Sequence, residues 1–231
     1  SLEAGSRVLL LDEETSSSSF LTSDSRLLSI QNPQSQSSLS SFAKRLVDEL
    51  GISIIVSGSS LVAEFLPIAD QVYKIEDYKV SDVTDEVKTL DITPNSLDST
   101  EDLSSILGRA RYIMPSSIDP SSKYDDVYID VDSEDFLYFG RSIIDTSYIN
   151  QISSADQVRT IGMILYYAKL RYMDEGYSLR EILDFVDRDL SNEGLNILIR
   201  NVCGNLSRPR RHEIAALINR LPAFRVSHIT N

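Results

Sequence analysis

Two short apolar runs, Val8–Leu11 and Ile52–Val56, place the strongest limit on how this chain can fold. The first run is apolar without alternation, which is typical of a strand covered on both faces in a parallel sheet, and the second, which holds one serine, is predicted to be another buried strand. Between the runs, apolar residues recur at helical spacing from Leu39 to Leu50, and a glycine follows as a natural helix cap. The order strand, helix, strand predicts a βαβ unit, whose crossover should be right-handed.

The remainder of the chain divides into a third strand, an acidic stretch and a helical end. Residues 72–76 continue the strand pattern, whereas residues 81–108 are polar and acidic with little periodicity. Residues 127–145 contain three short apolar segments that fit a small antiparallel sheet. Three helices are expected after them, and their starts are marked by Ser154 with Gln157, by Ser178 with Glu181, and by Pro209.

These patterns predict an α/β protein in three parts. Residues 1–80 should form a partial parallel sheet with helices, and residues 81–108 an acidic connecting arm. Residues 109–231 should form a mixed α/β, largely helical domain. A chain of 231 residues with 42% apolar content can bury a core of ordinary size in either of the two larger parts.

Composition predicts a cytoplasmic protein without membrane contact. The single cysteine, Cys203, excludes an internal disulfide framework and a cysteine-rich zinc site. The sequence shows neither an apolar run of membrane-spanning length nor a signal-peptide pattern. The net charge of −13 is concentrated in residues 77–135, which hold fifteen acidic and five basic residues. This acidic middle argues against a surface that wraps nucleic acid along its whole length.

Asp12 and Glu13, which directly follow the first apolar run, allow two interpretations. Many buried strands end in acidic residues only because the chain is leaving the core. Alternatively, the pair is a Walker B motif, in which Asp12 holds Mg²⁺ and Glu13 polarises the water that attacks a nucleotide phosphate. The second interpretation requires both acids at the carboxyl end of a parallel strand, where ligands bind in such sheets.

The wider sequence resembles the predicted ATPases of the ABC class. The resemblance covers nearly the whole chain, and it is carried by the motifs in combination. These motifs are LLLDEETSSSSFLTSDSRL, LGISIIVSGSS, ADQVYKIEDY, ARYIMPSSIDPS, YFGRSIIDTSYINQI, YYAKLRYMDEGYSLREILDFVDRDL and GNLSRPRRHEIAALINRL. It implies that residues 1–80 are the C-terminal part of an ABC-type nucleotide-binding domain, starting at the Walker B strand.

The resemblance also implies roles for individual residues. Asp12 matches the metal-associated aspartate, and Glu13 matches the catalytic glutamate. Nucleotide-binding positions fall in two short segments, one of which is similar to the loop that crosses between partners in an ABC dimer. These positions are Thr15, Ser16 and Ser17, which match that loop, and Ser57, Gly58 and Ser59 at the end of the second strand. ATP and Mg²⁺ are the implied cofactors, and a homodimer is an implied assembly.

The phosphate-binding part of such an enzyme is missing from this sequence. None of the nine glycines is followed by lysine, so the sequence contains no Gly-x-x-x-x-Gly-Lys-[Ser/Thr] cradle, and no ABC signature is present. Both motifs lie N-terminal to the Walker B strand in the family. We therefore expect a fragment of a longer ATPase, inactive alone, whose first partner is the missing N-terminal part of the same chain.

A second function class remains open: a non-catalytic module for nucleic-acid binding, protein binding or dimerisation. Arg208, Arg210 and Arg211 surround the start of the last expected helix, where the helix dipole disfavours cations. Their placement indicates an acidic partner. We favour an internal or intersubunit ion pair, with a nucleic-acid phosphate as the alternative.

Overall fold

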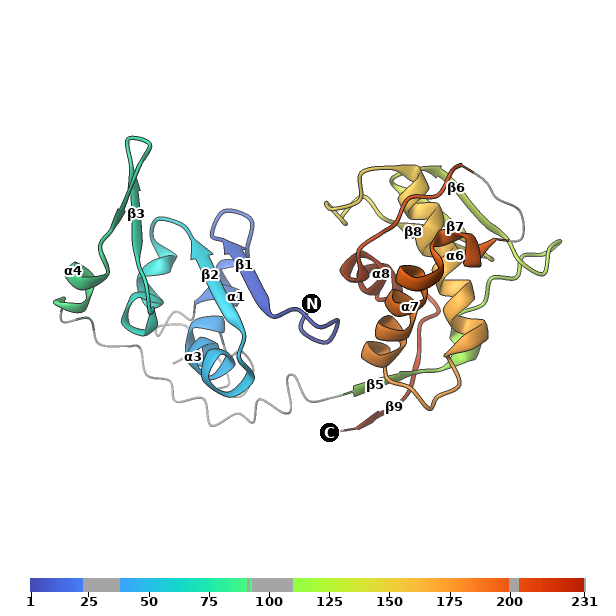
Figure 1. The fold of residues 1–231 in the computed structure, drawn as a ribbon, viewed down its shortest axis with the longest axis horizontal. Helices are drawn as coiled ribbons and strands as arrows, with labels where there is room; N and C mark the ends of the chain where they lie inside the picture. Colours follow the sequence, from blue (N-terminus) through green and yellow to red (C-terminus); the bar gives the residue numbers. More distant parts are fainter. Residues whose placement is uncertain (23–37, 91, 93–109, 200–203, 231) are drawn as a thin grey trace. The chain divides into compact units, whose positions relative to one another are not determined.

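The computed structural model describes residues 1–22, 38–90, 92, 110–199 and 204–230, which form two compact units. The N-terminal unit comprises Ser6–Glu101, and the C-terminal unit comprises Ser1–Gly5 together with Asp102–Asn231 (Figure 1). Much of the expected acidic arm lies outside the described residues. The mixed α/β architecture agrees with the fold class predicted from the sequence.

The N-terminal unit is built around a βαβ unit. Its elements are β1 (Val8–Asp12), α1 (Ser18–Leu21), α3 (Leu39–Leu50), β2 (Ser53–Ser57), the 3₁₀ turns η1 (Leu61–Glu64) and η2 (Leu66–Ile68), β3 (Tyr73–Glu76), β4 (Lys79–Asp82) and α4 (Thr84–Lys88). Strands β1 and β2 pair in parallel, with Val8 opposite Ser53 and Asp12 opposite Ser57. The predicted helix is confirmed as α3, and Gly51 caps it in the left-handed conformation (φ 63°).

Side-chain burial in the β1–β2 pair differs between its two faces. Alternate residues such as Leu9 and Ile54 are half-buried, and α3 contacts β2. On the other face, Val8, Leu10 and Ile55 are 50%, 73% and 58% exposed. The expectation of strands covered on both faces is therefore not met within the described residues, because they supply no cover for the second face.

The expected third strand exists as β3, but it does not join the parallel pair. It forms an antiparallel hairpin with β4, and the two strands are linked by Asp77 and Tyr78, which both have positive φ. Every residue of β3 and β4 is exposed. The hairpin is thus a separate two-stranded sheet, and β4 was not predicted.

The C-terminal unit holds the main hydrophobic core of the chain. Its elements are β5 (Ala110–Ile113), η3 (Pro115–Ser117), β6 (Ile129–Ser133), β7 (Phe136–Phe139), β8 (Ser142–Asp145), α6 (Ala155–Arg171), α7 (Leu179–Glu193), η4 (Leu195–Leu198), α8 (Arg211–Ile218) and β9 (Val226–Thr230). Strands β6, β7 and β8 form the predicted antiparallel sheet, and α6 packs against β6 and β7. Ile161 and Leu165 of α6 are fully buried, as is Leu137 of β7. No helix in the described part of the chain has both the length and the apolar character that crossing a membrane requires.

Helix capping follows the sequence closely. Ser178 accepts a hydrogen bond from the backbone N–H of Glu181, and the Glu181 carboxylate accepts one in return from the Ser178 N–H, which completes the predicted capping box. Ser154 caps α6 by accepting from the Gln157 N–H. These contacts satisfy N–H groups that the first helical turn leaves without partners.

The chain segment before β1 belongs to the C-terminal unit. Ala4 lies in the hydrophobic core and is 3% exposed. Glu3 forms a bidentate ion pair with Arg111 of β5, with an Nη2–Oε2 distance of 2.6 Å. The C-terminal unit is therefore discontinuous in sequence, which the sequence analysis did not anticipate.

Candidate active site

The acidic pair lies where two parallel strands end. Because β1 and β2 are in register, Asp12 and Ser57 are opposite each other at their carboxyl ends. The Glu13 N–H donates to the Ser57 carbonyl at 2.9 Å, which extends the pairing by one step. This is the edge at which parallel sheets bind ligands. The residues of the site come from β1, β2 and the loops that follow these strands (Figure 1).

The Asp12 carboxylate is held by hydroxyl and amide donors from both loops. Its Oδ1 accepts from the Ser57 hydroxyl at 3.0 Å. Its Oδ2 accepts from the backbone N–H and the hydroxyl of Thr15, both at 3.2 Å. The structure thus brings together three predicted site residues, one from each strand end and one from the turn after β1.

The Glu13 carboxylate turns toward the loop after β2. Its Oε2 accepts from the backbone N–H groups of Ser59, Ser60 and Leu61, at 2.7, 3.0 and 3.2 Å. Its Oε1 accepts from the Ser60 hydroxyl at 2.7 Å. The hydroxyl and then the backbone N–H of Ser60 lower the pKa of Glu13, desolvation opposes them, and the N–H groups of Ser59 and Leu61 lower the pKa further. Glu13 is therefore held as an anion.

Gly58 makes the approach of Glu13 to this loop possible. A Cβ atom at Gly58 would lie 2.2 Å from Glu13 Oε2 and 2.6 Å from Glu13 Cβ, closer than such atoms can approach. The predicted residues Gly58 and Ser59 are therefore in direct contact with the acidic pair. Ser60 and Leu61 also donate to Glu13 but were not predicted. For the Ser60 hydroxyl, the serine-rich sequence after the strand was the available signal.

The remaining predicted residues, Ser16 and Ser17, lie in the turn after β1. Ser16 donates its backbone N–H to the Asp12 carbonyl at 3.0 Å. The Ser17 hydroxyl shares a hydrogen bond with the Ser19 hydroxyl at 2.9 Å. Their side chains are therefore not engaged with the two carboxylates by any hydrogen bond that the structure shows.

The donor set at Asp12 fits Mg²⁺ only as part of a larger site. Within the described residues, His, Cys, Asp and Glu side chains form no group of three or more that could hold a metal ion. Mg²⁺ in nucleotide sites needs only one or two carboxylates, with water and substrate phosphates as further ligands. The Asp12 carboxylate and the hydroxyls of Ser57 and Thr15 are oxygen donors of that kind.

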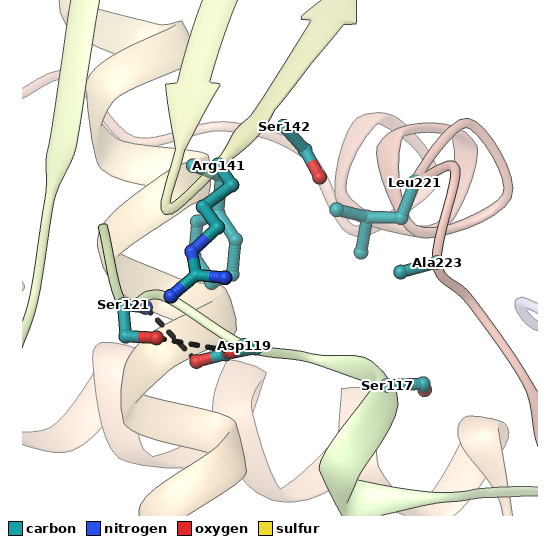
Figure 2. A pocket seen from close by; sticks show the side chains of 8 residues that line it. Ser117, Asp119, Ser121, Arg141, Ser142, Leu221 and Ala223 are labelled. Carbon is teal, nitrogen blue, oxygen red and sulfur yellow. Dashed lines mark hydrogen bonds between the residues drawn. The ribbon is translucent and has the colours of Figure 1, made fainter. Parts of the chain in front are cut away.

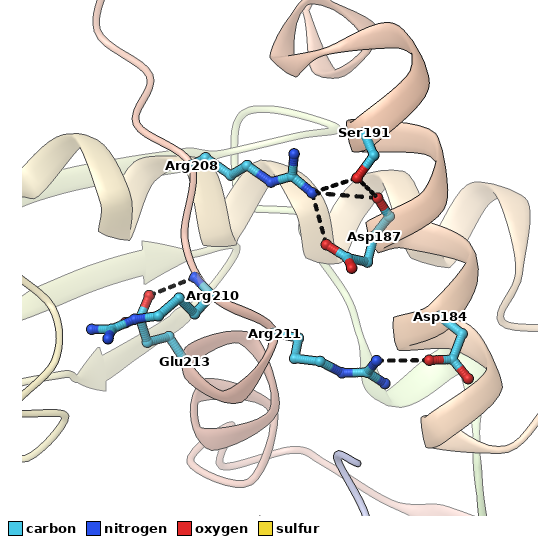
Figure 3. Close-up of polar contacts among 7 residues, drawn as sticks. All are labelled: Asp184, Asp187, Ser191, Arg208, Arg210, Arg211 and Glu213. Carbon is cyan, nitrogen blue, oxygen red and sulfur yellow. Dashed lines mark hydrogen bonds and ion pairs between the residues drawn. The ribbon is translucent and has the colours of Figure 1, made fainter. Parts of the chain in front are cut away.

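The three arginines near α8 all have acidic partners within the C-terminal unit (Figure 3). Their partners are Asp187 and Ser191 for Arg208, Glu213 for Arg210, and Asp184 for Arg211, at 2.7–2.8 Å. The Glu213 side chain is 2% exposed, and it also accepts from the backbone N–H of Arg210 at 2.8 Å. The sequence predicted an internal or an intersubunit ion pair, and these three pairs are internal.

A pocket of about 200 Å³ lies elsewhere in the C-terminal unit, between the loop after η3 and the turn from β7 to β8 (Figure 2). Its lining residues are Ser117, Asp119, Ser121, Phe139, Arg141, Ser142, Leu221 and Ala223. Asp119 accepts from the N–H and the hydroxyl of Ser121, both at 3.0 Å, and these bonds lower the Asp119 pKa. This pocket was not predicted from the sequence.

Two family models match the chain. Residues 1–109, which include the acidic pair, match the P-loop domain of the ABC ATPases. The match supports an ABC-class P-loop ATPase. Residues 129–227 match the MRB1590 C-terminal domain, which corresponds to most of the C-terminal unit. No curated protein matches the chain.

Proposed function

We propose that this chain is the part of an ABC-class ATPase that begins at the Walker B strand, with Asp12 associated with Mg²⁺ and Glu13 polarising the attacking water. The observation that supports it best is the pairing of β1 with β2, which sets Asp12 beside Ser57 at the carboxyl edge of a parallel sheet. Three donors bind the Asp12 carboxylate, and four bind the Glu13 carboxylate. Acidic residues that only mark the exit of a strand from the core would not need so many donors.

In this proposal, Glu13 accepts a hydrogen bond from water through Oε1. The water oxygen then forms a bond to the γ-phosphorus of ATP, the bond from that phosphorus to the β-phosphate oxygen breaks, and the water proton moves toward Glu13. Asp12, with the hydroxyls of Ser57 and Thr15, would hold Mg²⁺ through water. When bound, Mg²⁺ neutralises charge on the phosphate oxygens.

We also propose that this chain neither binds nor hydrolyses ATP by itself. It lacks the glycine–lysine cradle, and two adjacent carboxylates repel a polyphosphate. The exposed apolar face formed by Val8, Leu10 and Ile55 supports association with a further surface. We propose that this surface is the N-terminal part of the same polypeptide, which would carry the glycine–lysine cradle. The full-length protein would be cytoplasmic. Titration of this chain with labelled ATP and Mg²⁺ tests the claim, and micromolar affinity would refute it.

The decisive experiment is turnover by the full-length protein carrying Glu13→Gln. We expect kcat to fall by about 10²–10⁴-fold, because a positioned base contributes that much to a transition state. Glu14→Gln is the matched control, since Glu14 is the next residue and its side chain is exposed. Equal turnover by wild type and Glu13→Gln would overturn the catalytic assignment.

The second candidate function is a protein-binding or dimerisation module, and the same apolar face of β1 and β2 favours it. A nucleic-acid contact through Arg208, Arg210 and Arg211 would have to compete with their ion pairs to Asp187, Glu213 and Asp184. Pull-down with nucleic acid at low and high salt tests that contact, because phosphate binding weakens steeply as salt rises.

A further inference from the structure

We propose that Ser60, acting with the backbone N–H groups of Ser59 and Leu61, is the positioning residue for Glu13. The inference rests on the function proposed above, because it gives a role to a contact of the same carboxylate. Ser60 belongs to none of the predicted site groups. Its hydroxyl is the only side-chain donor that the described residues supply to Glu13, at 2.7 Å.

The two oxygens of the Glu13 carboxylate accept different numbers of hydrogen bonds. Oε2 accepts three backbone N–H groups, at 2.7, 3.0 and 3.2 Å, and is therefore fully engaged. Among the described residues, Oε1 accepts from the Ser60 hydroxyl alone. An ionised carboxylate oxygen has about two acceptor sites, so Oε1 keeps one that can accept from water. The loop thus fixes the group in one orientation while leaving one acceptor site open.

The neighbouring carboxylate is held by a different set of donors. Asp12 is bonded by Ser57 and Thr15, and none of its hydrogen bonds comes from Ser59, Ser60 or Leu61. The two acids are therefore oriented independently, although they are adjacent in sequence. Two roles in one site, metal association and water polarisation, require such a separation.

Backbone packing supports the same conclusion. The loop can approach Glu13 only because Gly58 has no side chain, since a Cβ there would lie 2.2 Å from Oε2. Each of the three N–H donors is a main-chain group, so their positions follow from the path of the loop between β2 and η1. Of these four donors, the Ser60 hydroxyl is therefore the one that substitution can remove without changing the path of the loop.

The test is the kinetics of the full-length protein with ATP and Mg²⁺. Ser60→Ala should lower kcat about tenfold and leave KM for ATP unchanged, because it removes one bond to the acid but no contact to nucleotide. Ser60→Thr keeps the hydroxyl and should restore kcat to within about threefold of wild type. Ser53→Ala, an exposed serine at the opposite end of β2, is the matched control and should behave as wild type.

A second measurement uses this chain alone. In Glu13→Ala, the N–H groups of Ser59, Ser60 and Leu61 lose their acceptor, so their hydrogen exchange should accelerate about tenfold or more relative to wild type. Exchange in helix α3, which belongs to the same unit as Glu13, should not change, which shows that this unit of the variant is folded. Unchanged exchange at all three amides would show that these N–H groups do not hold Glu13, and would overturn the proposal.

The outcomes separate this inference from the proposed function. If Glu13→Gln abolishes turnover but Ser60→Ala leaves kcat unchanged or raises it, the positioning role is refuted and the catalytic role of Glu13 stands. If Glu13→Gln leaves turnover unchanged, the proposed function fails whatever the result for Ser60. A rise in KM with unchanged kcat in Ser60→Ala would also refute positioning, because it would indicate a nucleotide contact.

Discussion

Asp189 of α7 accepts hydrogen bonds from two tyrosines, and the contribution of these bonds to stability can be measured. The hydroxyl groups of Tyr167 and Tyr172 both donate to its Oδ2, the first at 3.0 Å. Burial, followed by the bond and the charge of Asp189, raises the pKa of Tyr167 to about 12. The Asp189 side chain is 13% exposed, so water cannot easily replace the tyrosine donors. We predict that Asp189→Asn destabilises the C-terminal unit.

The magnitude follows from the bonds that are lost. Hydrogen bonds to a charged group contribute about 1.5–3 kcal/mol each, and an amide oxygen can retain part of one of them. We therefore expect the free energy of unfolding at neutral pH to fall by about 2–3 kcal/mol. Burial is the largest cause of the Tyr167 shift and stays in place. The Tyr167 pKa should therefore fall only part of the way from about 12 toward its ordinary value of 10.0.

The pH dependence has a definite sign. A tyrosine whose pKa is higher in the folded than in the unfolded state contributes stability that is complete below about pH 10. That contribution is lost as the pH rises through the folded value of about 12. For wild type, stability should fall as the pH rises from about 10 to about 12, and in Asp189→Asn this fall should be smaller, because two of the causes of the raised Tyr167 pKa are lost.

Urea unfolding at several alkaline pH values measures the stability, and site-resolved NMR of labelled tyrosine measures the Tyr167 pKa. Asp187→Asn is the matched control, because Asp187 lies two residues earlier on the same helix and its side chain is 53% exposed. It should cost less than about 1 kcal/mol and leave the tyrosine pKa unchanged. The reasoning is refuted if the two variants lose equal stability, or if Tyr167 titrates identically in wild type and Asp189→Asn.

Three further predictions concern the C-terminal unit. Glu213→Ala should cost about 3 kcal/mol in urea unfolding, because it removes a buried partner of the Arg210 N–H and guanidinium; a cost below about 1 kcal/mol would contradict the burial. Ser178→Ala should cost about 1 kcal/mol in the same assay through loss of the capping box, and Ser178→Asp should recover most of it. Leu165→Ala should cost about 3 kcal/mol and lower the melting temperature, since Leu165 is fully buried, whereas Leu170→Ala on the exposed side of α6 should change stability little.

The elements that the sequence predicted well are those with strong local signals. The helix from Leu39 to Leu50 has both a periodic apolar face and a glycine cap, and α7 has a complete capping box. The parallel β1–β2 pair was also predicted, because strand, helix and strand follow one another within a short stretch. In each case the determining interactions lie within a few residues or within one supersecondary unit.

The elements that were missed depend on distant or unusual partners. The hairpin of β3 and β4 turns at Asp77 and Tyr78, which adopt positive φ without glycine, so the usual turn signal is absent. Strands β5 and β9 pair between Ala110 and Thr230, and no local pattern reports a partner so far along the chain. Periodicity alone could not identify either pair.

The candidate site shows the same division. The acids Asp12 and Glu13 were identified because an apolar run ends in them, whereas Ser57 was implied by the resemblance to the ABC-class ATPases. The N–H groups that hold Glu13 come from the path of the loop and not from residue type, so sequence could not reveal them. Whether the nucleotide roles are correct is decided by the kinetic experiments above.

The pairing of Glu3 with Arg111 spans 108 residues, and the whole N-terminal unit lies between the two partners. During synthesis, residues 1–5 leave the ribosome before that unit and must wait until β5 and the later helices have followed. Ala4 can fill its place in the core only at that stage. Closure over so long a loop is entropically costly and slow. We therefore expect the N-terminal unit to acquire structure first and the C-terminal unit to complete its folding last.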